Sequence, residues 1–335
     1  MADYNELKGL KVKYLSADPP NPENGQVWYN STTGKLRVGG ILVPASWASG
    51  GNLGTARYQM GGAGNTNTAG LVYGGYNGST QYANTEEYDG SSWSGGGALP
   101  AGKRGMGNAG TQTAALSAGG FDGSPPPFVV TASEEYNGSS WTSGGSLGTK
   151  RGFTGGCGLQ TAALCVGGAS DSPAWVTDVN NVEHYDGSSW TNGTALPGAE
   201  RSSRPVGTQT AALNIGGLKS PGPGVQNSQE YDGSSWTAAG NISTARYGGA
   251  ASGIQTSAIF FGGSTPPGPV TAATERYDGS SWTADTSMPA GQYNNSSTVS
   301  SPSNNSLSTG GGPPASNVTI EYTGSSTATK NITTS

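Results

Sequence analysis

Short apolar runs alternate with polar, glycine-rich segments along most of the chain. The plainest of these runs, Thr-Ala-Ala-Leu, begins at Thr113, Thr161 and Thr210 and leads each time to a pair of glycines. Short apolar runs bounded by glycine are typical of strands, whereas a surface helix repeats its apolar residues every three or four positions. We therefore expect many short strands and no helix longer than about two turns.

An aromatic motif returns in the same register as the apolar runs. Tyr-Asp-Gly-Ser-Ser-Trp occupies residues 88–93 and returns at 136–141 (with Asn137 for Asp), 185–190, 231–236 and 277–282, and a sixth copy at 322–327 ends in Thr327. Successive tyrosines are 48, 49, 46, 46 and 45 residues apart. Asp-Gly between two strand-like runs is a strong hairpin signal, because glycine supplies the positive φ that the turn needs.

Each repeat is long enough for four strands, of which the last two flank the Asp-Gly turn. Four short antiparallel strands cannot bury two faces alone, but stacking such blades in a ring buries them. The pattern predicts an all-β chain that forms a six-bladed β-propeller of four-stranded blades. We expect the repeated aromatic residues to pack between blades; they are Tyr88, Trp93, Tyr136, Trp141, Tyr185, Trp190, Tyr231, Trp236, Tyr277, Trp282 and Trp47.

The glycine pair, the tyrosine before the turn and the tryptophan after it resemble the kelch repeat of galactose-oxidase-like propellers. The resemblance covers about residues 41 to 330. It implies kelch-like blades, but no particular function, because this architecture hosts enzymes, scaffolds and adhesins alike.

The way the ring closes is left open by the sixth repeat, which has Thr327 in place of a tryptophan. Trp47 lies 46 residues before Trp93, and no Tyr-Asp-Gly precedes it. Residues 41–48 or the C-terminal residues 328–333 could therefore supply the last strand. We favour residues 41–48, because the bulk of Trp47 fills the repeated slot between blades. The expected propeller domain spans residues 41–335.

Residues 1–40 lie outside the repeat, and we expect them to form an N-terminal arm. Residues 26–30 and 35–38 flank Ser-Thr-Thr-Gly, which predicts a small hairpin. The stretch 25–38 resembles segments common in bacteriophage tail and fibre proteins. This resemblance implies that the arm attaches the chain to other virion proteins.

Composition and charge exclude some classes of function. Charged residues make up only 11% of the chain and the net charge is −5, so we expect no nucleic-acid partner. No apolar run is long enough to span a membrane, and the first residues do not resemble a signal peptide, which favours synthesis in a cytoplasm. We expect Cys157 and Cys165 to be buried free thiols.

The search for catalytic residues is mostly negative. His184 is the only histidine, so a histidine metal site or a Ser-His-Asp triad has little to draw on. Glu86, Glu134, Glu183 and Glu275 share one position in the repeat, and a residue repeated in most blades is more often structural than catalytic. We expect no enzyme activity, no cofactor and no bound metal.

Two sets of residues are candidates for binding a ligand. Five arginines follow a tryptophan by ten or eleven residues, in the loop that enters the inner strand; they are Arg57, Arg104, Arg151, Arg201 and Arg246. They could ring the channel mouth and attract an anion. Alternatively, each pairs with a repeated glutamate and pins neighbouring blades, which we favour.

The second set is aromatic and lies on the loops between the second and third strands of the blades. It comprises Tyr76, Tyr82, Phe121, Phe128 and Trp175. Aromatic rings on a rigid scaffold can stack on sugars or anchor a protein partner. Simple variation of loop sequence is the alternative explanation.

These observations favour a non-enzymatic virion structural or adhesion protein of a bacteriophage, which presents a propeller face to a host-surface glycan or to a neighbouring virion protein. A cellular or secreted kelch-like module that binds glycans or proteins is the alternative, and a glycan-cleaving enzyme is third. The sequence does not identify the ligand, the host receptor or the oligomeric state.

Overall fold

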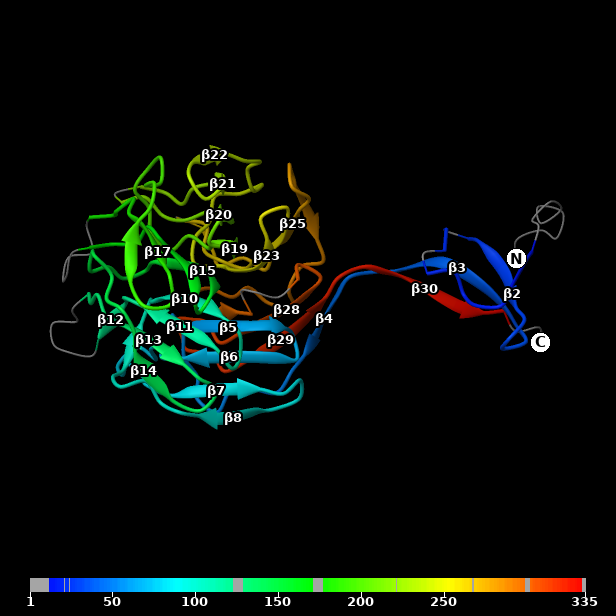
Figure 1. The fold of residues 1–335 in the computed structure, drawn as a ribbon, viewed down its shortest axis with the longest axis horizontal. Coiled ribbons are helices and arrows are strands. Elements are labelled where there is room, and N and C mark those ends of the chain that lie inside the picture. The colour runs from blue at the N-terminus through cyan, green and yellow to red at the C-terminus, as the bar shows by residue number, and fades with distance from the viewer. Residues whose placement is uncertain are drawn as a thin grey trace. The chain divides into compact units, whose positions relative to one another are not determined.

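The structure is a computed structural model that describes residues 12–20, 22–23, 25–122, 129–170, 177–220, 222–266, 268–298 and 302–332. Every regular element within these ranges is a strand (Figure 1). The chain divides into two compact units, one formed by residues 47–323 and the other by residues 1–46 together with 324–335.

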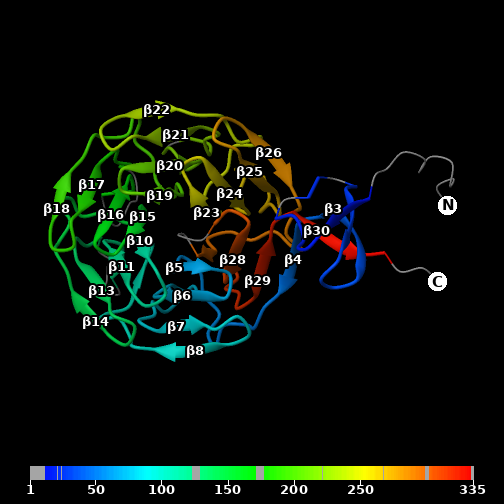
Figure 2. The same cartoon turned by 45° about the vertical axis from the view of Figure 1, so that its right-hand side comes forward.

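Residues 47–323 form the predicted six-bladed β-propeller, whose four-stranded sheets follow one another around a ring (Figure 2). The blades are, in order, β5 (Gly61–Thr66), β6 (Ala69–Tyr73), β7 (Thr85–Tyr88) and β8 (Trp93–Gly96); β10 (Gly107–Gly110), β11 (Ala115–Ala118), β13 (Ser133–Tyr136) and β14 (Trp141–Ser143); β15 (Gly155–Leu159), β16 (Ala162–Val166), β17 (Val182–Tyr185) and β18 (Trp190–Asn192); β19 (Val206–Thr208), β20 (Ala211–Ile215), β21 (Ser228–Tyr231) and β22 (Trp236–Ala238); β23 (Ala250–Ile254), β24 (Ser257–Phe261), β25 (Thr274–Tyr277) and β26 (Trp282–Asp285); and β27 (Ser296–Ser297), β28 (Asn305–Thr309), β29 (Thr319–Thr323) and β4 (Ser46–Ser49). Two short strands, β9 (Lys103–Arg104) and β12 (Phe121–Asp122), pair outside the blades.

The ring closes through β4, which adds the outer strand to the sixth blade. The indole N–H of Trp47 donates to the carbonyl oxygen of Thr286 at 2.9 Å, and its ring lies 5.0 Å from that of Tyr322. The closing strand is shorter than the expected residues 41–48. Ile41 pairs instead with Ala328, in a sheet of the other unit.

The second unit is a single sheet in the order β1 (Lys13–Leu15), β2 (Val27–Asn30), β3 (Lys35–Val43) and β30 (Ser326–Asn331). It contains the expected hairpin, in which β2 pairs with β3. The C-terminal strand β30 also belongs here and not to the propeller, so the division differs from the expected boundary between residues 40 and 41. The pairing of β30 along β3 is the physical reason, because it draws both ends of the chain into one sheet.

Repeated aromatic residues join neighbouring blades. Within each of the first five blades the tyrosine and tryptophan rings of the motif lie against each other, with centroids 4.9 Å apart in the first blade and 4.8 Å in the third. The indole N–H of Trp190 then reaches the Ser133 hydroxyl of the preceding blade at 3.0 Å. The corresponding bond in the second blade runs from Trp141 to Thr85 at 2.9 Å. The stacked pair therefore both fills and bonds the seam between blades.

The inner strands are rich in glycine because neighbouring backbones meet there. A Cβ atom on Gly156 would lie 2.4 Å from the backbone nitrogen of Asn108 in the adjacent blade. The Asn108 amide donates to the carbonyl oxygen of Gly62, on the other side, at 2.7 Å. Small residues on these strands thus allow six blades to close around a narrow axis.

Two further expectations from the sequence can be compared with the structure. Cys157 and Cys165 are buried and free, as predicted, and burial raises the pKa of Cys157 to about 12. Across the ranges that the structure describes, no helix has the length and apolar character needed to span a membrane.

Candidate ligand site at the mouth of the central channel

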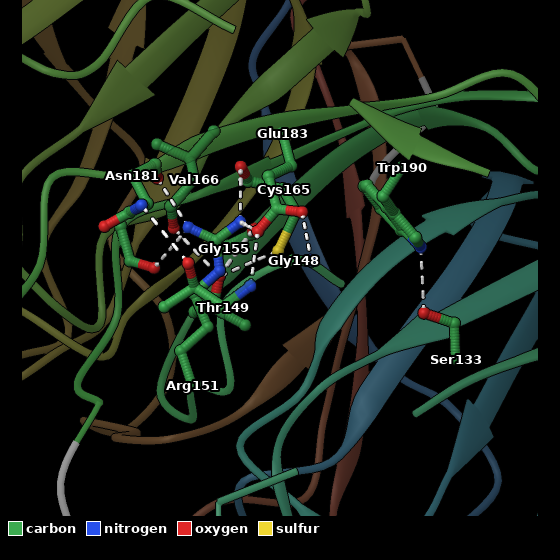
Figure 3. A network of polar contacts seen from close by, with 12 residues as sticks. Ser133, Gly148, Thr149, Arg151, Gly155, Cys165, Val166, Asn181, Glu183 and Trp190 are labelled. Atoms are coloured by element: carbon green, nitrogen blue, oxygen red, sulfur yellow. Dashed lines mark hydrogen bonds and ion pairs between the residues drawn. The ribbon is translucent and has the colours of Figure 1, made fainter. Parts of the chain in front are cut away.

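In four of the six repeats a basic residue is buried in an ion pair inside its own blade. The guanidinium of Arg151 lies 3.1 Å from the Glu183 carboxylate, and both side chains are almost completely buried (Figure 3). The same pair forms between Arg57 and Glu86, between Lys103 and Glu134, and between Arg246 and Glu275, at 2.8, 2.7 and 2.7 Å.

Backbone groups complete each of these buried pairs. Arg151 also donates to the carbonyl oxygen of Asn181 at 2.6 Å, while the N–H of Gly148 donates to Glu183 at 2.6 Å. A buried charge is tolerated when it is both paired and hydrogen-bonded. Arg57, Arg151 and Arg246 therefore pair with the repeated glutamates, as we favoured, but each pair lies within one blade and does not pin neighbouring blades. None of the three lines the channel cavity described below.

Arg104 and Arg201 are different, and the expected single register of five arginines is wrong. Arg57 lies four residues after Leu53, and the equivalent positions after Leu99 and Leu196 hold Lys103 and Glu200. Arg104 directly follows Lys103, and Arg201 directly follows Glu200. This shift places their side chains outside the buried pairing site.

The residue directly after the position of Arg104 and Arg201 has the same backbone conformation in every loop. In all six loops it has a positive φ, between 52° and 63°; these residues are Gln59, Gly105, Phe153, Ser202, Gly248 and Asn294. Their backbones bond from blade to blade: Gly105 N–H to Gln59 at 2.9 Å, Gln59 to Asn294 at 2.9 Å, Asn294 to Gly248 at 2.6 Å, Gly248 to Ser202 at 3.2 Å and Ser202 to Phe153 at 2.8 Å. The six loops thus form a belt around the channel mouth, which we call the axial belt.

A cavity of about 350 Å³ lies at this belt. Its lining residues are Gln59, Arg104, Phe153, Arg201, Ser202, Leu218, Tyr247, Tyr293 and Asn294, so every blade contributes at least one. We call it the axial cavity. It combines two guanidinium groups, three aromatic rings and two side-chain amides, which suits recognition of an anionic ligand that also offers a flat face.

The two arginines of the axial cavity are oriented by neighbouring side chains. The Arg104 guanidinium lies over the ring of Tyr76, 4.0 Å from its centroid, and burial lowers the pKa of Arg104. Arg201 forms an ion pair with Asp178 at 2.5 Å. An arginine carries five N–H donors, so one carboxylate does not exhaust its capacity to bind a second anion.

The aromatic loop residues that were predicted to bind a ligand differ in their burial and contacts. Tyr76 and Tyr82 are half-buried, and Tyr76 supports Arg104 as described above. Phe121 is completely buried, which corrects the expectation that it is an exposed binding residue. Its strand pairs with that of Arg104, and its ring packs 4.7 Å from Phe153. Phe128 and Trp175 lie outside the described residues.

Sequence reasoning missed the aromatic residues of the axial cavity. Tyr247 and Tyr293 pack edge to face with ring centroids 5.3 Å apart, and Phe153 lines the same cavity. A signal for the two tyrosines was present, because each directly follows the residue at the buried basic position, Arg246 or Gln292. This position alone does not reveal their role, because no spacing rule indicates that these loops converge at one cavity.

A repeated glutamine was also overlooked. Gln160 lies directly before the Thr-Ala-Ala-Leu run, and its amide donates to the carbonyl oxygens of Ala115 and Tyr136 in the preceding blade, at 2.9 and 2.7 Å. Gln112, Gln209 and Gln255 make the equivalent bonds. These residues hold the blades together at their turns and line no part of the axial cavity.

A larger cavity of about 720 Å³ lies beside His184, between the third and fourth blades. His184 takes the place of a glutamate in the contacts between blades: its Nε2 lies 2.9 Å from the Tyr231 hydroxyl, where the Tyr185 hydroxyl donates to Glu135 at 2.6 Å. Burial lowers the pKa of His184. Within the described ranges no three His, Cys, Asp or Glu side chains are grouped to hold a metal. The contact with Tyr231 therefore gives His184 a structural role between the blades. We favour the axial cavity as the ligand site.

Comparison with known proteins identifies the fold alone. No family model matches the sequence, and no curated protein matches it. Among solved structures, 271 chains match. One of them, the structure of YjhT, has a TM-score of 0.65 and 15% sequence identity, and the match covers 85% of this chain and 100% of that one. At this level of identity the similarity supports a β-propeller fold and carries no function.

Proposed function

We propose that this chain is a non-enzymatic adhesion protein of a bacteriophage particle, built from kelch-like blades, which binds a negatively charged host-surface glycan at the axial cavity. The observation that carries the proposal is that Arg104 and Arg201 face one cavity together with aromatic rings. At the position one residue earlier, Arg57, Lys103, Arg151 and Arg246 are instead buried in ion pairs.

The chemistry of the axial cavity suits an acidic sugar. Guanidinium groups bind carboxylates and sulfates through paired hydrogen bonds, while aromatic faces stack on the apolar face of a sugar ring. The axial belt fixes the loops before a ligand arrives, which lowers the entropic cost of binding. The side-chain amides of Gln59 and Asn294 supply donors and acceptors for hydroxyl groups.

The same lining argues against glycan cleavage. Glycosidases use two carboxyl groups on either side of the scissile bond. The described residues that line the axial cavity include two arginines and no carboxylate. We therefore assign it to binding rather than to hydrolysis.

In this proposal the other unit attaches the propeller to neighbouring virion proteins through residues 1–40. The proposal rests on the resemblance of residues 25–38 to phage tail and fibre segments. Asp18 ties its segment to β2, since its carboxylate accepts bonds from the Trp28 indole at 2.9 Å and the Asn30 amide at 2.8 Å. These bonds support the proposal that the small unit is a folded attachment module.

The binding test compares the full chain with Arg104→Gln and Arg201→Gln by calorimetric titration with an oligosaccharide of uronic acid and with its neutral counterpart. We expect the parent to bind only the acidic sugar and each variant to lose at least tenfold in affinity, since a charge-assisted hydrogen bond contributes about 1.5–3 kcal/mol. Lys150→Gln is the matched control, because it removes an exposed positive charge outside the cavity. Equal binding by all four proteins would refute the site.

The virion assignment needs a separate test. Mass spectrometry of purified phage particles should find this chain at a fixed copy number. Its absence from particles, together with acidic-sugar binding by the purified chain, would favour the alternative of a cellular or secreted glycan-binding module.

A further inference from the structure

The buried ion pair inside the blades has a constant geometry. In the fifth blade Arg246 donates to Glu275 at 2.7 Å and to the carbonyl oxygen of Ala273 at 3.1 Å. Glu275 is the Cα partner of Phe260 on the neighbouring strand, and the Arg246 guanidinium lies over that phenyl ring. One cation and one carboxylate thus neutralise each other in a buried site.

The fourth blade reverses this arrangement. Glu200 lies four residues after Leu196, which is the position of Arg246 relative to Ile242. Gln229 lies two residues before its tyrosine, where the fifth blade has Glu275, and its Cα partner is Asn214. The site has therefore lost its cation, and its carboxylate has moved to the place where the cation stood.

Three buried oxygen atoms of this site accept no hydrogen bond from the described residues. The Asn214 amide donates to Glu200 Oε1 at 2.6 Å, but Glu200 Oε2, Asn214 Oδ1 and Gln229 Oε1 have no donor. Glu200 and Asn214 are each 1% exposed and Gln229 is 7% exposed. A buried acceptor without a donor is costly, and a buried carboxylate without an ion-pair partner is more so. The charge of the exposed Lys219 acts on Glu200, but among the described residues the two side chains form no ion pair.

We propose that a monovalent metal cation, Na⁺ or K⁺, binds between Glu200, Asn214 and Gln229 in place of the guanidinium of the other blades. One positive charge balances the one carboxylate, and carboxylate and amide oxygens are the ligands that hard cations prefer. In the third blade Arg151 donates to the carbonyl oxygens of Gly167 and Asn181. The equivalent carbonyl groups, of Gly216 and Asn227, offer further ligands in the fourth blade.

A proton on Glu200 is the simplest competing occupant. It would bond Oε2 to one amide oxygen and leave the other without a donor, whereas a cation contacts all three oxygens together.

The test measures the melting temperature of the full chain in NaCl, KCl and choline chloride at one ionic strength and pH 8. We expect a higher melting temperature in NaCl or KCl than in choline chloride, and no difference between the salts for Glu200→Gln. Glu23→Gln, which neutralises an exposed carboxylate, should keep the full difference. The choline arm separates cation binding from general screening.

A second variant keeps the test decisive if Glu200→Gln does not fold. Glu200→Arg with Gln229→Glu rebuilds the pair of the fifth blade, and it should melt at the same temperature in all three salts. Equal melting of the parent in the three salts would overturn the proposal, as would a metal effect that survives in either variant. A parent that is insensitive to metal but less stable at pH 8 than at pH 5 would identify the occupant as a proton.

Discussion

The backbone N–H of Gln59 donates to the carbonyl oxygen of Asn294 at 2.9 Å, and this bond joins the first blade to the sixth at the channel mouth. Both residues have positive φ angles, of 56° and 54°. Because the bond uses only backbone atoms, it holds the loops in place while leaving their side chains free to vary. Four residues therefore belong both to the axial belt and to the lining of the axial cavity; they are Gln59, Phe153, Ser202 and Asn294.

The contacts between blades predict how much the free energy of unfolding falls when a motif tryptophan is removed. Trp190→Ala removes a ring that stacks on Tyr185 and a hydrogen bond to Ser133, so we expect a loss of about 3 kcal/mol in the free energy of unfolding, near the lower end for buried aromatics. Urea denaturation measures it. Thr191→Ala, an exposed change at the next residue, should cost less than about 0.5 kcal/mol. Equal midpoints for both variants would contradict the packing role.

The buried ion pairs predict a strong coupling between their partners. Arg151→Met should lower the free energy of unfolding by about 3–5 kcal/mol, because it leaves the Glu183 carboxylate buried without a cation. Adding Glu183→Leu should recover part of this loss, since the uncompensated charge is removed. A double-mutant cycle in guanidinium chloride measures the coupling, and additive losses would show that the two side chains act independently.

Because the inner strands are closely packed, we expect a single added methyl group to destabilise the fold. Gly156→Ala would place a Cβ atom 2.4 Å from the backbone of Asn108 and should destabilise by about 1–3 kcal/mol. Gly95→Ala is the control, because a Cβ atom there meets nothing within 4 Å. Thermal melts of the two variants should differ, and a neutral Gly156→Ala would mean that the blades can move apart without cost.

Glu200 predicts a pH dependence of stability when no metal cation is present. Burial raises its pKa from 4.5 to about 7, with Asn214 and the charge of Lys219 opposing the shift and the charge of Asp178 adding to it. The folded chain then binds more protons than the unfolded chain between these values, so stability falls as pH rises from about 4.5 to about 7 and levels off above. Melts in choline chloride should show this fall, and Glu200→Gln should flatten it. The same fall in the variant would assign it to another group.

The loop aromatic residues that the sequence singles out predict which substitutions matter for binding. Phe128→Ala or Trp175→Ala should weaken binding of the glycan or the virion partner without changing the melting temperature. Ser188→Ala, in the turn between β17 and β18, should leave binding unchanged, because the Ser188 hydroxyl bonds back to Asp186 within its own turn. Particle adsorption to host cells measures the effect, and loss of adsorption in Ser188→Ala alone would show that the turns bind and the aromatic loops do not.

The sequence already contained a sign of how the arginines divide. Arg57 and Arg151 follow their tryptophans by ten residues, whereas Arg104 and Arg201 follow theirs by eleven. Treating the two spacings as one register concealed that the first pair is buried and the second lines the axial cavity. In an extended segment a shift of one residue turns a side chain to the opposite face, so spacing must be read to the single residue.

The sequence by itself determined the repeat, the number of blades and the stacked tyrosine and tryptophan, because these depend on local patterns that recur along the chain. Only the tertiary structure decided that Ile41 pairs with Ala328, that Phe121 is buried, and that Phe153 and Tyr293 share one cavity. These contacts join segments far apart in the chain, and their geometry follows from ring closure rather than from any local signal. A periodic sequence therefore specifies its repeating unit. The contacts at the axis form only when all the units have closed into a ring, so the sequence of one repeat does not reveal them.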